Sequence, residues 1–120
     1  MAFDQGLSGL NAASQNLNVI GNNVANANTV GFKQSQAQFA DVYANSLAGS
    51  GTLQVGSGTT VATVAQQFSQ GTISATSNSM DIAISNSGFF RMDNNGAITY
   101  SRNGQFQLDQ NGYMVNSQGL

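Results

Sequence analysis

Hydrophobic residues in the N-terminal part of the chain recur with a heptad spacing. Phe3, Leu10, Leu17 and Val24 stand seven positions apart. In an α-helix this spacing gathers the side chains in one stripe, and an apolar stripe of this kind packs against a partner helix. We therefore predict a helix over residues 3–26. Its apolar seam consists of Phe3, Leu7, Leu10, Ala13, Leu17, Ile20 and Val24.

The other faces of this predicted helix carry no charge, since no charged side chain occurs between Asp4 and Lys33. A helix that faces water normally has charged residues on its outer side, whereas this one has Asn, Gln, Ser and Gly. The pattern favours an assembly element that contacts protein on several sides over a catalytic domain. One alternative stays open, in which the seam docks on the β region of the same chain.

The pattern changes after the helix. Residues 30–43 read as an extended or short mixed segment. Residues 48–60 are rich in Gly, Ser and Thr, which predicts a flexible loop that encloses a short strand at residues 53–55.

From residue 61 onward, short runs with alternating polarity are separated by turn signals. Asn95-Gly96, Asn103-Gly104 and Asn111-Gly112 are typical of tight hairpin turns. The predicted strands cover residues 61–68, 80–85, 89–92, 97–101, 105–108 and 113–116. They form a meander of hairpins.

The predicted fold class is α+β, with an N-terminal coiled-coil-forming helix followed by a mainly antiparallel β domain that is incomplete. The expected organisation is an axial helix in residues 1–30, a linker with the Gly-rich loop in residues 31–60 and a β-rich domain in residues 61–120.

The composition of the chain excludes further classes of function. Only 7% of the residues are charged, compared with about 25% in typical domains. Lys33, Arg91 and Arg102 are far apart and form no basic patch, so we expect no nucleic-acid binding. No cationic amphipathic helix and no long apolar stretch occurs, so we expect no membrane insertion. A chain with so little charge suits a subunit that packs among copies of itself.

The residue types needed for common catalytic sites are missing. The chain has no His, Cys or Glu, which excludes Ser-His-Asp, Cys-His and the usual zinc sites. Its Asp residues are well separated, and a paired-carboxylate site would need the fold to bring two of them together. Residues 93–96 faintly resemble a calcium loop but lack the remaining ligands, so a hairpin turn is the preferred interpretation. We expect no enzyme, no metal and no cofactor.

Several blocks of the N-terminal part match a known signature. Its residues are Ser8, Gly9, Leu10, Asn22, Asn23, Ala25, Asn26, Thr29, Gly31, Phe32 and Lys33. These blocks resemble the N-terminal signature of the bacterial flagellar axial proteins, the family of rod, hook and hook-associated subunits. Residues 39–43, 80–85, 88–91 and 100–109 resemble hook subunits in particular. A distal rod subunit is the alternative, a secreted β-rich adhesin is less favoured, and an enzyme is least favoured.

The resemblance implies a structural subunit of the hook, the tube that works as a universal joint between rod and filament. Its expected partners are further copies in a helical tubular polymer, the C-terminal helix of the full-length protein, and the hook cap, rod and hook–filament junction proteins. Because the sequence ends before the remaining β domains and that helix, we interpret it as an N-terminal piece.

The resemblance also implies an extracellular location in the flagellum. The N-terminus has neither the cationic start nor the apolar core of a cleaved secretory signal. Export would therefore go through the flagellar type III apparatus without cleavage. Phe39, Val42 and Tyr43 resemble a short motif recognised by the export gate. The alternative is that these residues anchor the linker to the β domain.

Overall fold

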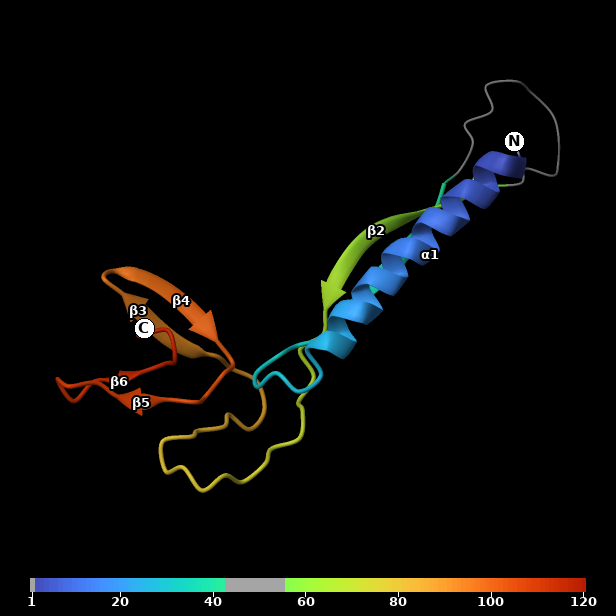
Figure 1. The fold of residues 1–120 in the computed structure, drawn as a ribbon. Helices are drawn as coiled ribbons and strands as arrows, with labels where there is room; N and C mark the ends of the chain where they lie inside the picture. Colours follow the sequence, from blue (N-terminus) through green and yellow to red (C-terminus); the bar gives the residue numbers. More distant parts are fainter. Residues whose placement is uncertain (1, 43–55) are drawn as a thin grey trace. The chain divides into compact units, whose positions relative to one another are not determined.

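The structure, a computed structural model, describes residues 2–42 and 56–120, and it has one long helix followed by short strands (Figure 1). This arrangement confirms the predicted α+β class. The chain divides into two compact units. The first unit comprises Met1–Asn26 and Gln34–Gln67, and the second comprises Ala27–Lys33 and Phe68–Leu120. The elements are α1 (Ala2–Ala25), β1 (Ser35–Asp41), β2 (Thr59–Gln66), β3 (Phe90–Asn94), β4 (Ala97–Ser101), β5 (Gln107–Leu108) and β6 (Met114–Val115).

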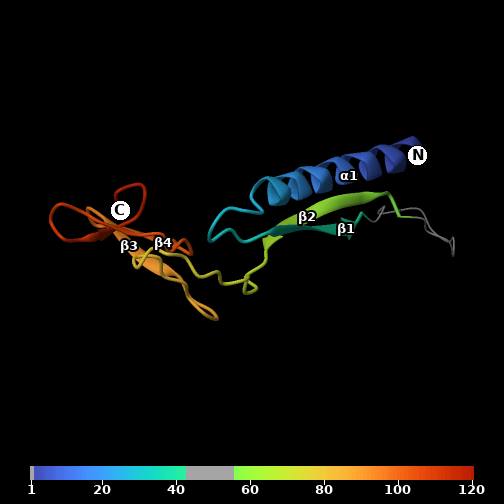
Figure 2. The same cartoon turned by 60° about the horizontal axis from the view of Figure 1, so that its bottom comes forward.

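In the first unit, α1 lies along an antiparallel pair formed by β1 and β2 (Figure 2). The register runs from Ser35 opposite Gln66 to Asp41 opposite Thr59. The residues that pack α1 onto the strands are small, since Ala12 on the helix is 7% exposed and Ala37 on β1 is 8% exposed. Two methyl side chains at this interface let the backbones of helix and strand approach closely.

The helix needs this support, because its sequence is a poor helix former. Asn and Gly recur through the 24 residues of α1, and each costs up to about 1 kcal/mol relative to Ala. Polar contacts with the neighbourhood of β2 help to fix its N-terminal part. The side-chain amide of Gln5 donates to the carbonyl of Gly56 at 2.6 Å, and the Ser8 hydroxyl accepts the N–H of Thr59 at 3.3 Å.

Asn23 fixes the other end of α1 to β1. Its side-chain nitrogen donates to the carbonyl of Ser35 at 2.7 Å, and its side-chain oxygen accepts the N–H of Ser35 at 2.9 Å. An amide side chain with this geometry satisfies both backbone groups as a neighbouring strand would. Asn23 therefore closes part of the β1 edge, where unpaired groups would otherwise invite pairing with another chain.

The second unit contains two short hairpins, β3–β4 and β5–β6. The turn at Asn95-Gly96 has positive φ at both residues, 51° and 94°, as a type I′ hairpin turn requires. Phe106 is 8% exposed and meets Phe90 edge to face, with ring centroids 5.0 Å apart. The rings of Phe89 and Phe90 diverge, because Phe89 contacts Phe68 instead, at 5.8 Å.

Several predicted strands agree with the structure. β4 matches residues 97–101, β2 covers most of residues 61–68, and β3 follows the expected residues 89–92 by a short shift. β5 and β6 are shorter than the predicted strands at residues 105–108 and 113–116. The predicted strand at residues 53–55 lies outside the described residues.

Two predictions for the β region were wrong. Residues 80–85 form no strand and contribute only an isolated bridge between Asp81 and Gln105. The side chains of Thr76 and Asn78 donate to the Asp81 carboxylate at 2.7 and 3.0 Å, which bends the chain there.

The second error concerns Asn103-Gly104, which was predicted to be a hairpin turn. β4 and β5, which flank it, do not pair, and the described strands form separate two-stranded sheets rather than one continuous meander. The Gly104 carbonyl instead accepts the N–H of Ile82 at 2.9 Å.

The bidentate contact of Asn23 can be tested by a matched pair of substitutions on α1. Asn23→Ala and Asn18→Ala give the helix the same gain in propensity, but only Asn23 bonds to Ser35. We expect Asn18→Ala to stabilise the chain slightly, and Asn23→Ala to lower the free energy of unfolding by about 1–2 kcal/mol relative to Asn18→Ala. Urea titration followed by circular dichroism measures both, and equal stabilities would contradict the contact.

Candidate assembly surface

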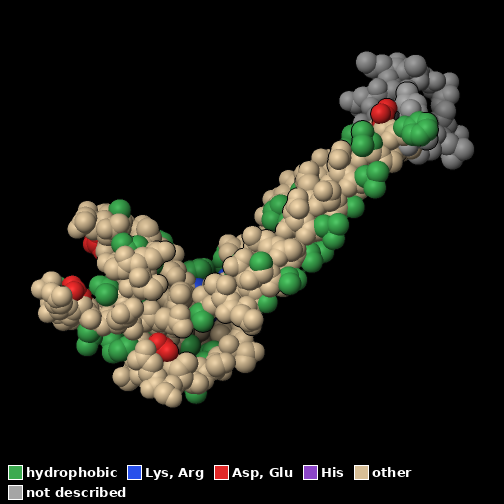
Figure 3. Space-filling model, in the orientation of Figure 1, with side chains coloured by type: hydrophobic (Ala, Val, Ile, Leu, Met, Phe, Trp, Pro, Cys, Tyr) green, Lys and Arg blue, Asp and Glu red, His purple; other side chains and the backbone are tan. Residues whose placement is uncertain are grey.

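The predicted apolar seam of α1 faces away from β1 and β2. Phe3 is 92% exposed, Leu10 70%, Leu17 67% and Val24 69%. Leu7, Ala13 and Ile20 are exposed as well. Figure 3 shows the hydrophobic side chains in a line along α1, on the edge away from β2. The alternative in which the seam docks on the chain's own β region therefore does not hold for β1 and β2, the strands of the first unit.

A second row on α1 lies against β1 and β2, the antiparallel pair that is called the β1–β2 hairpin from here on. Its side chains are mostly small or polar, and they are shielded, whereas those of the seam are exposed. This hairpin-facing row consists of Gln5, Ser8, Gly9, Ala12, Asn16, Val19 and Asn23. Most of its members also follow alternating steps of four and three residues, so two stripes run along one helix. We missed this row in the sequence because only apolar periodicity was counted.

An exposed line of large apolar side chains is unusual on a monomer and marks an interaction surface. Burying one such side chain in a contact contributes about 1.5–3 kcal/mol. The surface can therefore bind a second apolar helix. Its role in assembly stays a prediction at this point.

The signature residues do not all lie on the seam. Leu10 belongs to it, whereas Ser8, Gly9 and Asn23 belong to the hairpin-facing row. Asn22 and Ala25 are exposed near the end of α1, where the Asn26 side chain donates to the Asn22 carbonyl at 3.0 Å. Thr29, Gly31, Phe32 and Lys33 lie in the second unit.

The residues of the predicted export motif are partly described. Phe39 lies on β1 next to a register shift and is 43% exposed. Val42 follows the strand, is 39% exposed and exchanges backbone hydrogen bonds with Ser57 and Gly58. Tyr43 lies outside the described residues. Phe39 and Val42 are thus accessible side chains on or beside a paired strand.

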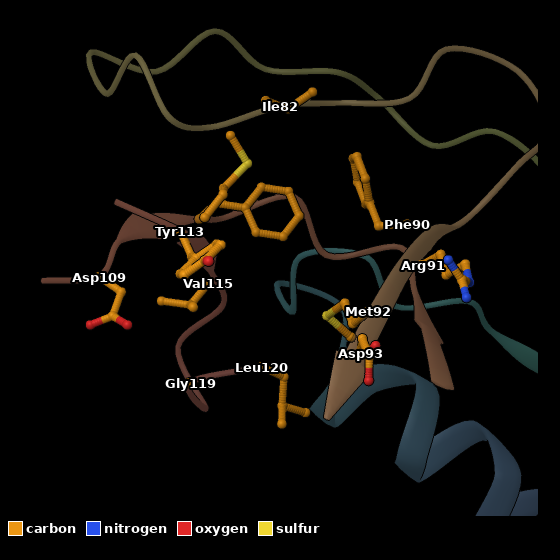
Figure 4. A pocket seen from close by; sticks show the side chains of 12 residues that line it. Ile82, Phe90, Arg91, Met92, Asp93, Asp109, Tyr113, Val115, Gly119 and Leu120 are labelled. Atoms are coloured by element: carbon orange, nitrogen blue, oxygen red, sulfur yellow. The ribbon is translucent and has the colours of Figure 1, made fainter. Parts of the chain in front are cut away.

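The second unit has a hollow of about 490 Å³ between its hairpins (Figure 4). Apolar side chains dominate its lining, among them Ile82, Phe90, Val115 and Leu120. Tyr113, which also lines the hollow, is 71% exposed, and Tyr100 on β4 is 67% exposed. The second unit therefore leaves much apolar surface uncovered.

Within residues 2–42 and 56–120, no three His, Cys, Asp or Glu side chains come together as metal ligands would. Over the same residues, no helix has the length and hydropathy needed to cross a bilayer. The described surface carries exposed apolar side chains along α1 and on the hairpins of the second unit, as the surface of a structural subunit does.

Comparisons with known proteins agree with this class. A family model described as flagella basal body rod protein matches residues 3–33, and one described as flagellar hook protein FlgE/F/G D1 domain matches residues 83–120. The flagellar hook protein FlgE of Escherichia coli is 54% identical over 121 aligned residues, covering 100% of this chain and 28% of the relative. FlgE of Salmonella typhimurium is 52% identical with the same coverage.

The flagellar basal-body rod protein FlgG of Bacillus subtilis is more distant, at 36% identity over 73% of this chain and 37% of the relative. The chain belongs to the flagellar rod and hook protein family, whose members are structural proteins. It spans 28% of the length of the two FlgE hook proteins.

Two adjacent alanines test the assignment of the helix faces. Ala12 is buried against the hairpin, whereas Ala13 is exposed on the seam. Ala12→Leu should lower the free energy of unfolding by about 1–3 kcal/mol through overpacking. Ala13→Leu introduces the same side chain on the open face and should change stability by less than about 0.5 kcal/mol. Urea unfolding of both variants decides the matter, and a larger loss in Ala13→Leu would reverse the two faces.

Proposed function

We propose that this chain is the N-terminal part of a flagellar hook subunit, which polymerises into the flexible tube between rod and filament. The exposed seam on α1 carries this proposal, since it offers apolar surface along the whole helix. The identity of 54% to a hook protein over all of this chain supports hook over the other members of the family.

In this proposal the seam of α1 pairs with a helix from the C-terminal part of the full-length protein. Further copies of the subunit surround this pair, and the uncharged sides of α1 contact them or line the central channel. The second unit is the start of an outer β domain. Its hollow and its exposed aromatic side chains are covered by the remainder of the full-length subunit. The matching hook protein is much longer than this chain, which covers 28% of it.

The remaining parts of the proposal concern partners and location. The subunit contacts the rod, the hook cap and the hook–filament junction proteins, and it acts outside the cell without enzymatic activity. The flagellar export apparatus secretes it without cleavage. Phe39, Val42 and Tyr43 are the residues proposed for recognition by the export gate, and the exposure of Phe39 and Val42 is compatible with that role.

A distal rod subunit is the second candidate. It is favoured by the match of residues 3–33 to the rod protein model and by the similarity to FlgG. A rod would use the same seam in a rigid shaft. A secreted adhesin would have no use for such a seam.

Hook and rod can be separated by immunogold electron microscopy of isolated hook–basal bodies, with an antibody raised against residues 60–120. We expect gold along the curved hook. Gold confined to the straight shaft would assign the protein to the rod. Absence of gold from an intact and accessible structure would argue for the adhesin.

The seam itself is tested in the full-length protein with Leu10→Gln and Leu17→Gln together. Gln has nearly the helix propensity of Leu, so the change removes apolar contact without breaking the helix. We expect loss of hooks and of motility while the protein is still exported. Asn18→Gln, on an exposed position outside the seam, is the control and should leave motility intact. Normal hooks in the double variant would refute the role of the seam.

The uncharged channel wall gives a further prediction. Asn11, Asn18 and Asn22 are exposed on α1, and Lys at any of them would add fixed charge to the wall or to a subunit contact. We expect slower export or assembly, measured as hook length and swimming speed, whereas Gln at the same positions should have little effect. Unchanged motility in all Lys variants would count against a channel or contact role.

A further inference from the structure

Residues 102–104, between β4 and β5, form the place where several segments of the second unit meet. Gly104 is buried and accepts no side chain, because a Cβ there would lie 1.6 Å from the Ile82 carbonyl oxygen. Ile82 in turn donates its N–H to the Gly104 carbonyl at 2.9 Å. The Asn-Gly pair is thus used as a close backbone contact rather than as a turn.

Arg102 forms hydrogen bonds with residues 84–88, the segment that precedes β3. Its guanidinium donates to the carbonyls of Ile84 at 2.9 Å and Asn86 at 2.5 Å, and also to the carbonyl of Gly88. A further bond runs to the side-chain oxygen of Gln70 at 2.7 Å. Arg can do this because its planar fork presents several N–H donors in fixed directions. Arg102 therefore fixes the local shape of residues 84–88 around itself.

The backbone at Asn103 is in close contact with Gly31, which lies much earlier in the chain. Gly31 has φ +79°, and a Cβ on it would lie 2.5 Å from the Asn103 backbone nitrogen and 2.7 Å from the Arg102 carbonyl carbon. Both neighbours are backbone atoms, which cannot swing aside as the end of a side chain could. A second attachment lies nearby in the sequence, where the Lys33 ammonium group donates to the Ser69 carbonyl at 2.6 Å.

We propose that Arg102 and Asn103 form a docking site for the segment Ala27–Lys33, which is a fixed part of the second unit and not a flexible linker. The absence of a side chain at Gly31 gives the close approach, and Lys33 adds a charged hydrogen bond at the end of the segment. Thr29 and Phe32 give the segment a turn of its own, since the Phe32 N–H donates to the Thr29 carbonyl at 3.2 Å.

This inference deepens the proposed function and rests on it in one respect. If α1 carries load in a hook, part of that load enters the second unit at Ala27, which directly follows the α1 side of one of the places where the chain passes between the units. A docked segment transmits force directly, whereas a flexible one would absorb it by extending. The docking itself is a property of the isolated chain and can be tested without a hook.

The test uses the fact that the chain has no Cys, so one introduced Cys carries a spin label at a single place. Gln105 is exposed and two positions from Asn103. With the label at Gln105→Cys, docking should broaden the backbone amide signals of residues 29–33 in the NMR spectrum. Gly31→Ala should remove that broadening, because its methyl group cannot fit against Asn103.

Gly112→Ala is the matched control. Gly112 has φ +81°, close to that of Gly31, but nothing lies within 4 Å of its Cβ position. It therefore imposes similar backbone strain without a steric clash, and the broadening should remain. Absence of broadening in the parent chain, or its persistence in Gly31→Ala, would overturn the proposal.

If Gly31→Ala also disturbs the signals of β3 and β4, the loss of broadening could come from misfolding of the second unit. A second variant then tests the docking. Lys33→Met keeps the length of the side chain but loses the bond to Ser69. With β3 and β4 intact, weaker broadening of residues 29–33 supports docking, and unchanged broadening contradicts it. None of these results depends on hook assembly, so a failure here leaves the antibody test of the proposed function unaffected.

Discussion

The contact between the hairpin-facing row of α1 and the strands β1 and β2 determines which face of the helix is exposed. Ala12 and Ala37 give close packing, and Asn23 adds two hydrogen bonds to Ser35. Because the small and polar residues of α1 face β1 and β2, the apolar seam lies on the outer side of the helix. If the helix were rotated to bury its seam, the seam would no longer be available to a partner.

The contact between α1 and the strands consists of small side chains and a few hydrogen bonds. Hydrogen bonds such as those of Gln5 and Asn23 contribute about 0.5–1.5 kcal/mol each. The helix sequence itself opposes helix formation through its Asn and Gly residues. Burial of the seam by a partner would therefore supply a large share of the stability. Since α1 carries no charge after Asp4, that burial meets little electrostatic repulsion between copies and little dependence on salt.

Sequence reasoning succeeded where the pattern of neighbouring residues determines the structure. Heptad spacing gave α1 nearly to its ends, and Asn95-Gly96 gave the β3–β4 turn. It failed where distant segments decide. Residues 80–85 alternate in polarity, yet the side-chain bonds of Asp81 bend the chain, and Asn103-Gly104 serves contacts to Gly31 and Ile82. Such contacts leave no local periodicity by which they could be recognised.

The signature and the seam make different physical demands on the sequence. A seam requires apolar side chains at the correct spacing, and Leu, Ile or Val can each meet that demand with small changes in stability. The intrachain contacts require particular residue types: an amide at Asn23 to match two backbone groups, and no Cβ at Gly31. Residues 3–33 therefore carry two kinds of information. The apolar spacing specifies an exposed apolar surface, and the exact residues specify how each end of this stretch is held within its own unit.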